Sequence, residues 1–355
     1  MTQCSSQAPD SSAGERGAAL IIVLLLVASL SFIIVAMTDR LSISVRRTGA
    51  VAVRDVLIWQ TVGLEAFARQ AIGELARSSE EVRSVYSLEN PLFRAPVALP
   101  VNRGEGEIQF SDGGRCFNVN SLATTSSGPG QSGERDVDQG QTGDGQTGTT
   151  VSPAQEFRAL VTSIGLGAPE AERLIAVVRD WVDADTIQGV GGAEDNLYTL
   201  LPTPYRTGGQ RLAEISELRA MDGVNAETYS ALKLILCALP TNERPSLNIN
   251  MLRPQDAPLL VGATGGRLSA AAATDVIASR PPGGWKTVGE FLALPALQPD
   301  PEDQVNFSDR FDIRSTFIDV RGTASAEAID IDVRLLFNAE GGNVRLLRRR
   351  IGEAA

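Results

Sequence analysis

The chain has 355 residues and a formal net charge of −11, with 43 acidic residues, 32 lysines and arginines, and no histidine. This length exceeds the usual size of a single hydrophobic core, so we expect two structural units beyond any membrane segment. The acidic balance argues against nucleic-acid partners, because phosphates would be repelled. The lack of histidine excludes Ser-His-Asp and Cys-His catalysis and histidine-bound zinc, which favours a binding or structural role over an enzyme.

An unbroken apolar run over residues 18–37 follows a small polar leader, residues 1–17. The run is about long enough to cross a bilayer as one helix, and it exceeds the ~7–15 apolar residues of a cleaved secretory signal. We therefore predict a transmembrane helix over residues 18–40. Its orientation does not follow from charge, because the leader contributes only Arg16, against Asp10 and Glu15, whereas more arginines follow the run: Arg40, Arg46, Arg47 and Arg54.

The leader, with Gly17 directly before the apolar run, resembles a type IV prepilin signal. That resemblance implies cleavage between Gly17 and Ala18 by a prepilin peptidase, methylation of the new terminus, and a C-terminal domain in the periplasm, beyond the inner membrane. The alternative is a simple signal anchor with no pilin connection.

Ile22 would be the fifth mature residue, where most prepilin-type proteins carry a glutamate. A carboxylate in the hydrocarbon layer is costly unless it is paired, and in pilins its partner is thought to be the terminal amine of the subunit above. Ile22 in the filament-packing helix therefore predicts a subunit that has no neighbour above it.

Beyond the anchor, the pattern changes from one long amphipathic helix, residues 42–83, to short strands. Alternating residues and a glycine turn near Gly341 predict a C-terminal hairpin. The other predicted strands are residues 95–101, 107–112 and 115–119.

The block between these strands is mostly helical in pattern, and we interpret it as an insertion over residues 121–306. Its first part, residues 124–153, is rich in Ser, Gly, Gln and Thr and predicts a flexible linker. The flanking parts, residues 41–120 and 307–355, would form a pilin-like domain. The predicted fold class is thus α+β, with a long N-terminal transmembrane helix on a small antiparallel sheet and a large inserted helical domain.

The three cysteines leave one even pair after processing, because Cys4 would depart with the leader. Cys116 and Cys237 would then lie in an oxidising compartment. A disulfide between them and two separate buried thiols both stay open, since the sequence does not bring them within bonding distance.

Five carboxylates surround a glycine-rich loop in the inserted block. Oxygen ligands at such density are what calcium sites require. An EF-hand register that starts at the second acid fails, because Ile187 and Gln188 replace a ligand and a glycine. We predict a structural calcium site, with a solvated acidic loop as the alternative. The five residues are Asp180, Asp183, Asp185, Glu194 and Asp195.

Six segments resemble, in the same order, the signature of the general secretion pathway protein K family, the minor pseudopilins of type II secretion. The apolar N-terminal helix and Ile22 also fit this family, so the resemblance covers nearly the whole chain. The segments are Cys116–Leu122 (CFNVNSL), Asp180–Asp185 (DWVDAD), Gly192–Tyr198 (GAEDNLY), Pro202–Arg206 (PTPYR), Ser216–Arg219 (SELR) and Leu247–Asn250 (LNIN).

This resemblance implies a subunit at the tip of the type II secretion pseudopilus that supports filament initiation and protein export across the outer membrane. It implies calcium binding, and it names other minor pseudopilins as partners, with secreted exoproteins as further candidates. A bulky insertion would also obstruct stacking of a subunit above. Two alternatives stay open: a minor tip pilin of a related type IV pilus, and a membrane-anchored periplasmic metal-dependent hydrolase, which bound zinc or manganese with turnover would indicate.

Overall fold

A computed structural model describes most of the chain. Residues 1–11 of the leader and residues 126–148 of the predicted linker lie outside the described part, whereas Gly17 and Ala18 lie within helical backbone. The described ranges are residues 12–81, 86–101, 104–125, 149–298, 305–327, 329–340 and 342–352.

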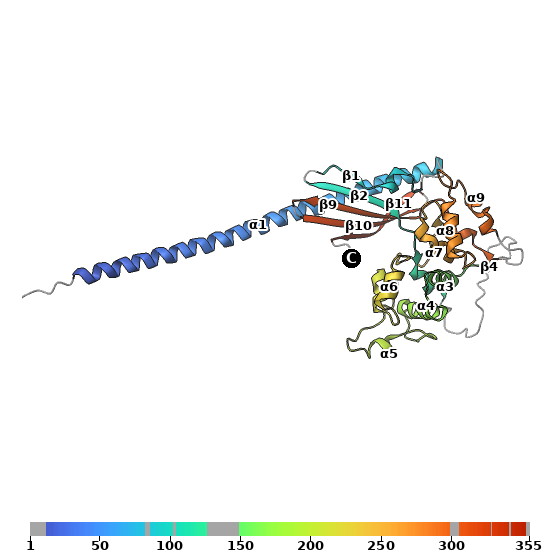
Figure 1. Ribbon diagram of the computed structural model, residues 1–355, viewed down its shortest axis with the longest axis horizontal. Helices are drawn as coiled ribbons and strands as arrows, with labels where there is room; N and C mark the ends of the chain where they lie inside the picture. Colours follow the sequence, from blue (N-terminus) through green and yellow to red (C-terminus); the bar gives the residue numbers. More distant parts are fainter. Residues whose placement is uncertain are drawn as a thin grey trace, which may run out of the picture.

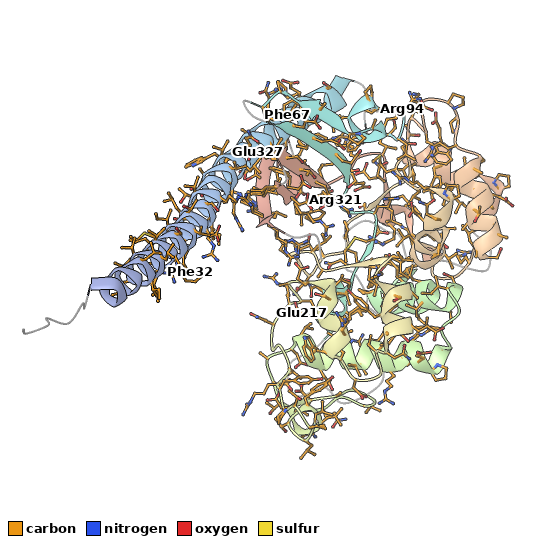
Figure 2. The ribbon with its side chains drawn as sticks, turned by 60° about the vertical axis from the view of Figure 1, so that its left-hand side comes forward. Phe32, Phe67, Arg94, Glu217, Arg321 and Glu327 are labelled. Atoms are coloured by element: carbon orange, nitrogen blue, oxygen red, sulfur yellow. A yellow bond between two sulfur atoms is a disulfide. The ribbon has the colours of Figure 1, made fainter. Side chains whose placement is uncertain are left out.

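Helix α1 (Ser12–Glu81) is 70 residues long, and its first half projects from the rest of the chain (Figure 1). Its apolar window near the N-terminus is not buried by any other described residue. Ile22 and Phe32 are 59% and 76% exposed, and Phe32 stands on the projecting part (Figure 2). Large apolar side chains stay exposed at this density only where lipid or another protein covers them, so the helix has the form of the predicted anchor.

The second half of α1 packs on an antiparallel sheet of five strands in the order β1-β2-β9-β10-β11. Leu57, Leu64 and Ile72 recur on one face of the helix and are fully buried against the sheet, which contributes Ile108 and Phe337 to the same core. The strands are β1 (Val97–Leu99), β2 (Glu105–Asp112), β9 (Phe317–Ala326), β10 (Ile329–Glu340) and β11 (Asn343–Ile351).

The predicted C-terminal hairpin is confirmed, since β10 and β11 pair antiparallel around a turn that contains Gly342 at φ +76°. The strand expected at residues 115–119 differs from the prediction. It is the two-residue β3 (Phe117–Asn118), which pairs with β5 (Leu236–Cys237) and not with the sheet. The reason is a turn at the end of β2, where the Gly114 amide donates to Asp112 Oδ1 at 2.9 Å and redirects the chain.

The helical domain is inserted between β2 and β9 and has a hydrophobic core separate from that of the sheet. It lies at the end of the sheet opposite the projecting part of α1 (Figure 1). Its helices are α3 (Pro153–Ser163), α4 (Ala168–Val182), α5 (Asp195–Tyr198), α6 (Ala226–Leu232), α7 (Ala257–Ala263), α8 (Ala270–Ala278) and α9 (Val288–Leu292), with α2 (Pro91–Arg94) outside it beside β2.

Short strands and 3-10 turns connect these helices. The strands pair as β4 (Thr149–Thr150) with β7 (Val305–Asn306), and β6 (Leu247–Asn248) with β8 (Phe311–Asp312). The turns are η1 (Val119–Thr125), η2 (Ile215–Ala220), η3 (Pro254–Asp256), η4 (Pro295–Leu297) and η5 (Ser308–Arg310).

A disulfide closes the helical domain near its first residues, and a hydrogen bond connects the domain to the sheet. Cys116 and Cys237 form a disulfide in the structure, with Cα atoms 5.7 Å apart. Arg348 of β11 donates to the Ala213 carbonyl at 2.7 Å, beside η2, which carries Glu217 (Figure 2).

Candidate metal centre

The acidic loop begins where α4 ends. Asp180 lies in the last turn of α4, Asp183 is its C-cap, and Glu194 is the N-cap of α5. The loop returns so that one carboxylate oxygen from each of these three residues lies within 4.8 Å of the others. Two helix ends and the loop between them therefore place three acids at one point.

Glycines allow the loop to close around Asp180, which is buried. The Gly189 amide donates to both carboxylate oxygens of Asp180, at 3.2 and 3.1 Å. A Cβ atom on Gly192 would lie 2.1 Å from Asp180 Oδ2, so no larger residue fits at this position without displacing the acid. From the sequence, these glycines indicate only a flexible loop. Their contact with Asp180 is not predictable from the sequence, because it depends on the path of the backbone.

Within the described part of the chain, the cluster has no paired positive charge. Asp183 Oδ1 and Glu194 Oε1 are buried there without a described hydrogen-bond partner, and Glu194 is only 1% exposed. Among the described residues, no arginine or lysine forms an ion pair with any of the three acids. A buried carboxylate oxygen without a donor is unfavourable, which indicates that a cation or a proton completes this site.

The pKa values of the three acids respond to this environment. Burial, and then the charges of Asp185 and Asp180, raise the pKa of Asp183 to about 6. Burial is also the largest cause that raises the pKa of Asp180 and of Glu194. The charges of Asp183 and Asp180 also raise the pKa of Glu194, and a divalent cation would reverse these effects.

The structure leaves the other two predicted ligands outside this group. Asp185 Oδ1 accepts from the Ile187 amide at 2.8 Å in a local turn. Asp195 Oδ1 accepts from the amide and hydroxyl of Thr207, at 2.9 and 3.1 Å, and its Oδ2 pairs with Arg206. These bonds engage Asp195 in holding the loop, and the Thr207 amide is the main reason that its pKa is lowered.

The donor set favours one kind of ion. Three carboxylates without histidine or cysteine suit a hard cation such as calcium, which takes oxygen ligands in flexible geometry. Zinc and the later transition metals prefer nitrogen and sulfur ligands, which this cluster lacks. The residues present fit the predicted calcium ion, with Asp180, Asp183 and Glu194 as its carboxylate ligands.

An aromatic cluster borders the acids. Trp181 and Tyr198 meet edge-on with ring centroids 5.4 Å apart, and Tyr205 stacks on Tyr198 at 5.2 Å. The Tyr205 hydroxyl donates to the Ala220 carbonyl at 2.7 Å. These rings attach the acidic loop to the core of the helical domain.

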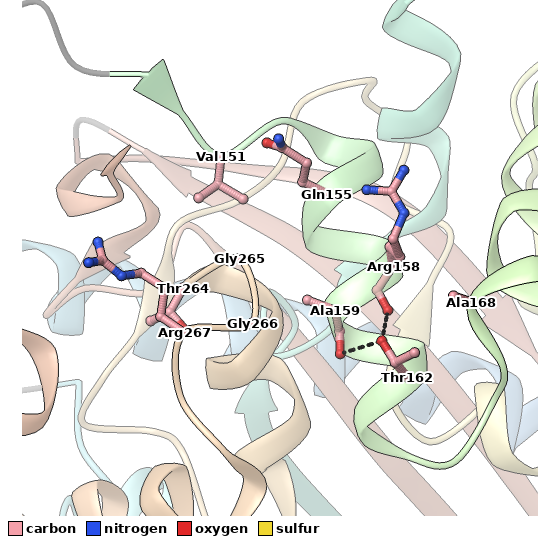
Figure 3. A pocket seen from close by; sticks show the side chains of 10 residues that line it. All are labelled: Val151, Gln155, Arg158, Ala159, Thr162, Ala168, Thr264, Gly265, Gly266 and Arg267. Carbon is pink, nitrogen blue, oxygen red and sulfur yellow. Dashed lines mark hydrogen bonds between the residues drawn. The ribbon is translucent and has the colours of Figure 1, made fainter. Parts of the chain in front are cut away.

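A separate cavity of about 470 Å³ lies between α3 and the turn after α7 (Figure 3). Its lining contains Arg158 and Arg267 but no carboxylate or cysteine among the described residues. The Thr162 hydroxyl there donates to carbonyls within its own helix, and Arg158 pairs with Glu172. The Thr162 hydroxyl and the Arg158 guanidinium are thus both engaged with other described residues.

Together, the fold and the anchor define the class of protein: a single-pass, membrane-anchored pilin-like protein with a helical domain inserted into its sheet. Models of the family described as type II secretion system (T2SS), protein K match residues 115–241 and 247–314, more than half of the chain.

Curated relatives give the same result. The type II secretion system protein K of Pectobacterium carotovorum subsp. carotovorum is 32% identical over 338 residues, which cover 95% of this chain and 97% of the relative. The protein of the same name from Klebsiella pneumoniae is 30% identical, with 95% and 97% covered. The chain belongs to the type II secretion system protein K family, and it is a minor pseudopilin of type II secretion.

A solved structure is similar in fold. It is a chain in the crystal structure of the GspK-GspI-GspJ complex from enterotoxigenic Escherichia coli, with a TM-score of 0.68 at 24% sequence identity. The match covers 87% of this chain and 100% of that one. The predicted fold class is thus confirmed, and the family models and curated relatives confirm the predicted family.

Proposed function

We propose that this minor pseudopilin occupies the tip of the pseudopilus, with its helical domain in the periplasm and its anchor in the inner membrane. The observation that carries this proposal is the position of the helical domain, at the end of the molecule opposite the membrane part of α1 (Figure 1). A domain in this place would obstruct a subunit stacked above, and Ile22 lacks the carboxylate that such a subunit would neutralise.

The proposed partners are other minor pseudopilins, and the role is in assembly and export rather than in catalysis. The fold of this chain is similar to that of a protein solved in a complex with two further chains, GspI and GspJ, which supports a tip complex of similar composition. Secreted exoproteins would meet the same end of the filament. Co-purification of the chain with candidate minor pseudopilins tests the complex, and label distributed along the shaft instead of at one end would contradict the tip position.

Processing is part of this proposal. The prepilin peptidase would cut after Gly17, so sequencing of the mature protein should begin at Ala18. The variant Gly17→Ala should block cleavage, because its methyl group would crowd the cut site. Mature protein that still begins at Met1 in cells with active peptidase would contradict it.

We further propose that Asp180, Asp183 and Glu194 bind a structural calcium ion. The buried, unpartnered oxygens of Asp183 and Glu194 support this assignment. Terbium, a luminescent oxygen-seeking ion, provides a direct test, because the neighbouring Trp181 should sensitise its emission and calcium should quench the signal by displacement.

Two matched variants, one at a proposed ligand and one at a neighbouring acid, should differ in the terbium signal. Asp183→Asn should abolish the terbium signal, whereas Asp195→Asn should retain it. A signal equal in both variants would show that the ion binds elsewhere. Bound zinc or manganese with hydrolytic turnover would instead support the enzyme alternative.

A further inference from the structure

Two parts of the helical domain repeat the same asparagine bonds. Asn120 Oδ1 accepts from the Leu212 amide at 2.8 Å, and its Nδ2 donates to the Leu212 carbonyl at 2.9 Å. Asn250 makes the same pair of bonds to Trp285, at 2.9 and 3.0 Å. Each asparagine ends an Asn-x-Asn triplet that starts in a short parallel strand.

The helix pairs that follow these triplets also correspond. Between α3 and α4, the Leu166 amide donates to the Val161 carbonyl, and Gly165 has φ +102°. Between α7 and α8, the Gly266 amide donates to the Val261 carbonyl, and Gly265 has φ +65°. The two turns thus close on the same helix position with a left-handed glycine.

An arginine near the end of the second helix binds back to the start of each part. Arg179 Nε donates to the Leu122 carbonyl at 3.3 Å, and Arg280 Nη1 donates to the Leu252 carbonyl at 2.7 Å. Each leucine lies two residues after the second asparagine of its triplet.

A glutamate then closes the turn that follows in each part. Glu217 accepts from the Ala213 amide at 2.8 Å, and Glu290 accepts from the Lys286 amide at 2.7 Å. The donor in each case directly follows the residue bonded to the asparagine. Four matching features in the same order indicate two copies of one structural unit.

The copies differ in one connection. In the second copy, four residues connect Arg280 to Trp285, namely Pro281–Gly284. In the first copy, the equivalent connection from Arg179 to Leu212 contains 32 residues, 180–211. The longer connection contains helix α5 and the three converging acids Asp180, Asp183 and Glu194. Its ends lie close together, because the Gly209 amide donates to the Trp181 carbonyl at 3.0 Å.

We propose that residues 180–211 form a lobe inserted into the first copy, and that the cation orders this lobe without supporting the rest of the helical domain. The inference rests on the calcium site proposed above. The second copy closes the same unit with a four-residue loop, so the unit does not require the lobe. Ile187 and Leu200 on the lobe are 77% and 84% exposed, so the cation controls how these apolar side chains are presented.

Hydrogen exchange of the full chain in detergent, with calcium or with EGTA, tests the proposal. EGTA should speed exchange in residues 183–209 at least about tenfold, equivalent to ~1.4 kcal/mol of opening free energy, and leave α3, α7 and α8 unchanged. The double variant Asp183→Asn/Glu194→Gln should lose the response to calcium, so that its exchange in residues 183–209 is the same in calcium as in EGTA. Equal acceleration in α7 and α8 would overturn the proposal.

A deletion separates failure of this inference from failure of the calcium site. Residues 183–208 are replaced by a short Gly-Ser linker, which the approach of Gly209 to Trp181 permits. The variant should form the Cys116–Cys237 bond and unfold cooperatively, without response to calcium. Exchange in rising urea provides the second measurement: lobe amides that open before those of α3 support the insertion even if no ion binds. Loss of folding in the deletion variant, together with one shared opening of lobe and α3, would overturn it.

Discussion

Glu156 and Glu194 are buried acids of the same domain with opposite surroundings. Glu156 is 4% exposed and accepts from Arg310 at 3.0 and 3.1 Å and from Arg244 at 2.8 Å. Glu194 is 1% exposed but faces Asp180 and has an oxygen without a donor. The difference teaches that burial alone does not mark an acid as a candidate ligand, and that Glu194 is a candidate because its buried oxygen lies beside other acids without a donor among the described residues.

Removal of the Glu156 charge should produce the largest change in unfolding free energy. Glu156→Gln leaves the Arg310 guanidinium, whose side chain is 5% exposed, buried without its counter-charge. We expect a loss of about 3–5 kcal/mol in unfolding free energy, measured by urea denaturation. The control is Glu172→Gln at the exposed pair with Arg158, which should cost under ~1 kcal/mol. Similar losses in the two variants would show that Arg310 finds other partners.

Asp112 is an intermediate case, because it accepts hydrogen bonds from the Gly114 amide and the Ser315 hydroxyl and lies near both Arg115 and Asp256. Burial raises its pKa to about 6, so the folded protein binds a proton more tightly than the unfolded chain does. The contribution of Asp112 to the free energy of unfolding is therefore most favourable below the pKa that this group has in the unfolded chain. That contribution is lost as the pH rises through about 6.

Asp112→Asn keeps the oxygen acceptor and removes this penalty. It should raise stability at pH 8 by up to about 3 kcal/mol, and the gain should shrink toward pH 5. Paired urea titrations in EGTA at the two pH values measure the difference, since the cluster of Asp180, Asp183 and Glu194 is common to both proteins. A gain that does not depend on pH would contradict the assignment.

Glu194→Gln should have an effect that changes sign with calcium. In calcium it removes a ligand, and we expect affinity to fall at least about tenfold, or ~1.4 kcal/mol, by calorimetric titration. In EGTA it removes repulsion within the cluster, so the lobe should become more protected from exchange. A variant that is less protected in both conditions would indicate that Glu194 acts only as a helix cap.

Asp195→Asn should have the smallest effect. Its oxygens already accept from Thr207 and pair with Arg206, so calcium affinity should stay within about threefold, or ~0.65 kcal/mol. The same titration measures it. A tenfold loss would place Asp195 among the ligands after all.

The parts of the fold that the sequence predicts well depend on local pattern. Helix α1 follows from its apolar run, and the hairpin of β10 and β11 follows from alternation around a glycine turn. The short β3 was not predictable as such, because its partner β5 lies over a hundred residues away. Long-range pairing depends on packing that a local pattern does not contain.

The candidate site shows the same limit. The acids of residues 180–195 are conspicuous in the sequence, yet only three converge, because the loop folds on the space left by Gly189 and Gly192. Asp195 is removed from the group by Thr207, a contact twelve residues along the chain. Composition therefore indicates the type of candidate ligand, whereas the backbone path decides which acids converge.

The disulfide has a consequence for breakage of the chain. Cys116 and Cys237 are 121 positions apart, so the bond closes a covalent ring that contains α3, α4 and the acidic lobe. One proteolytic cut inside this ring, for example after the exposed Arg206, would release no fragment, because both pieces stay joined through sulfur. A nicked protein would run as one band on a gel without reductant and as two with it, and could remain in the filament.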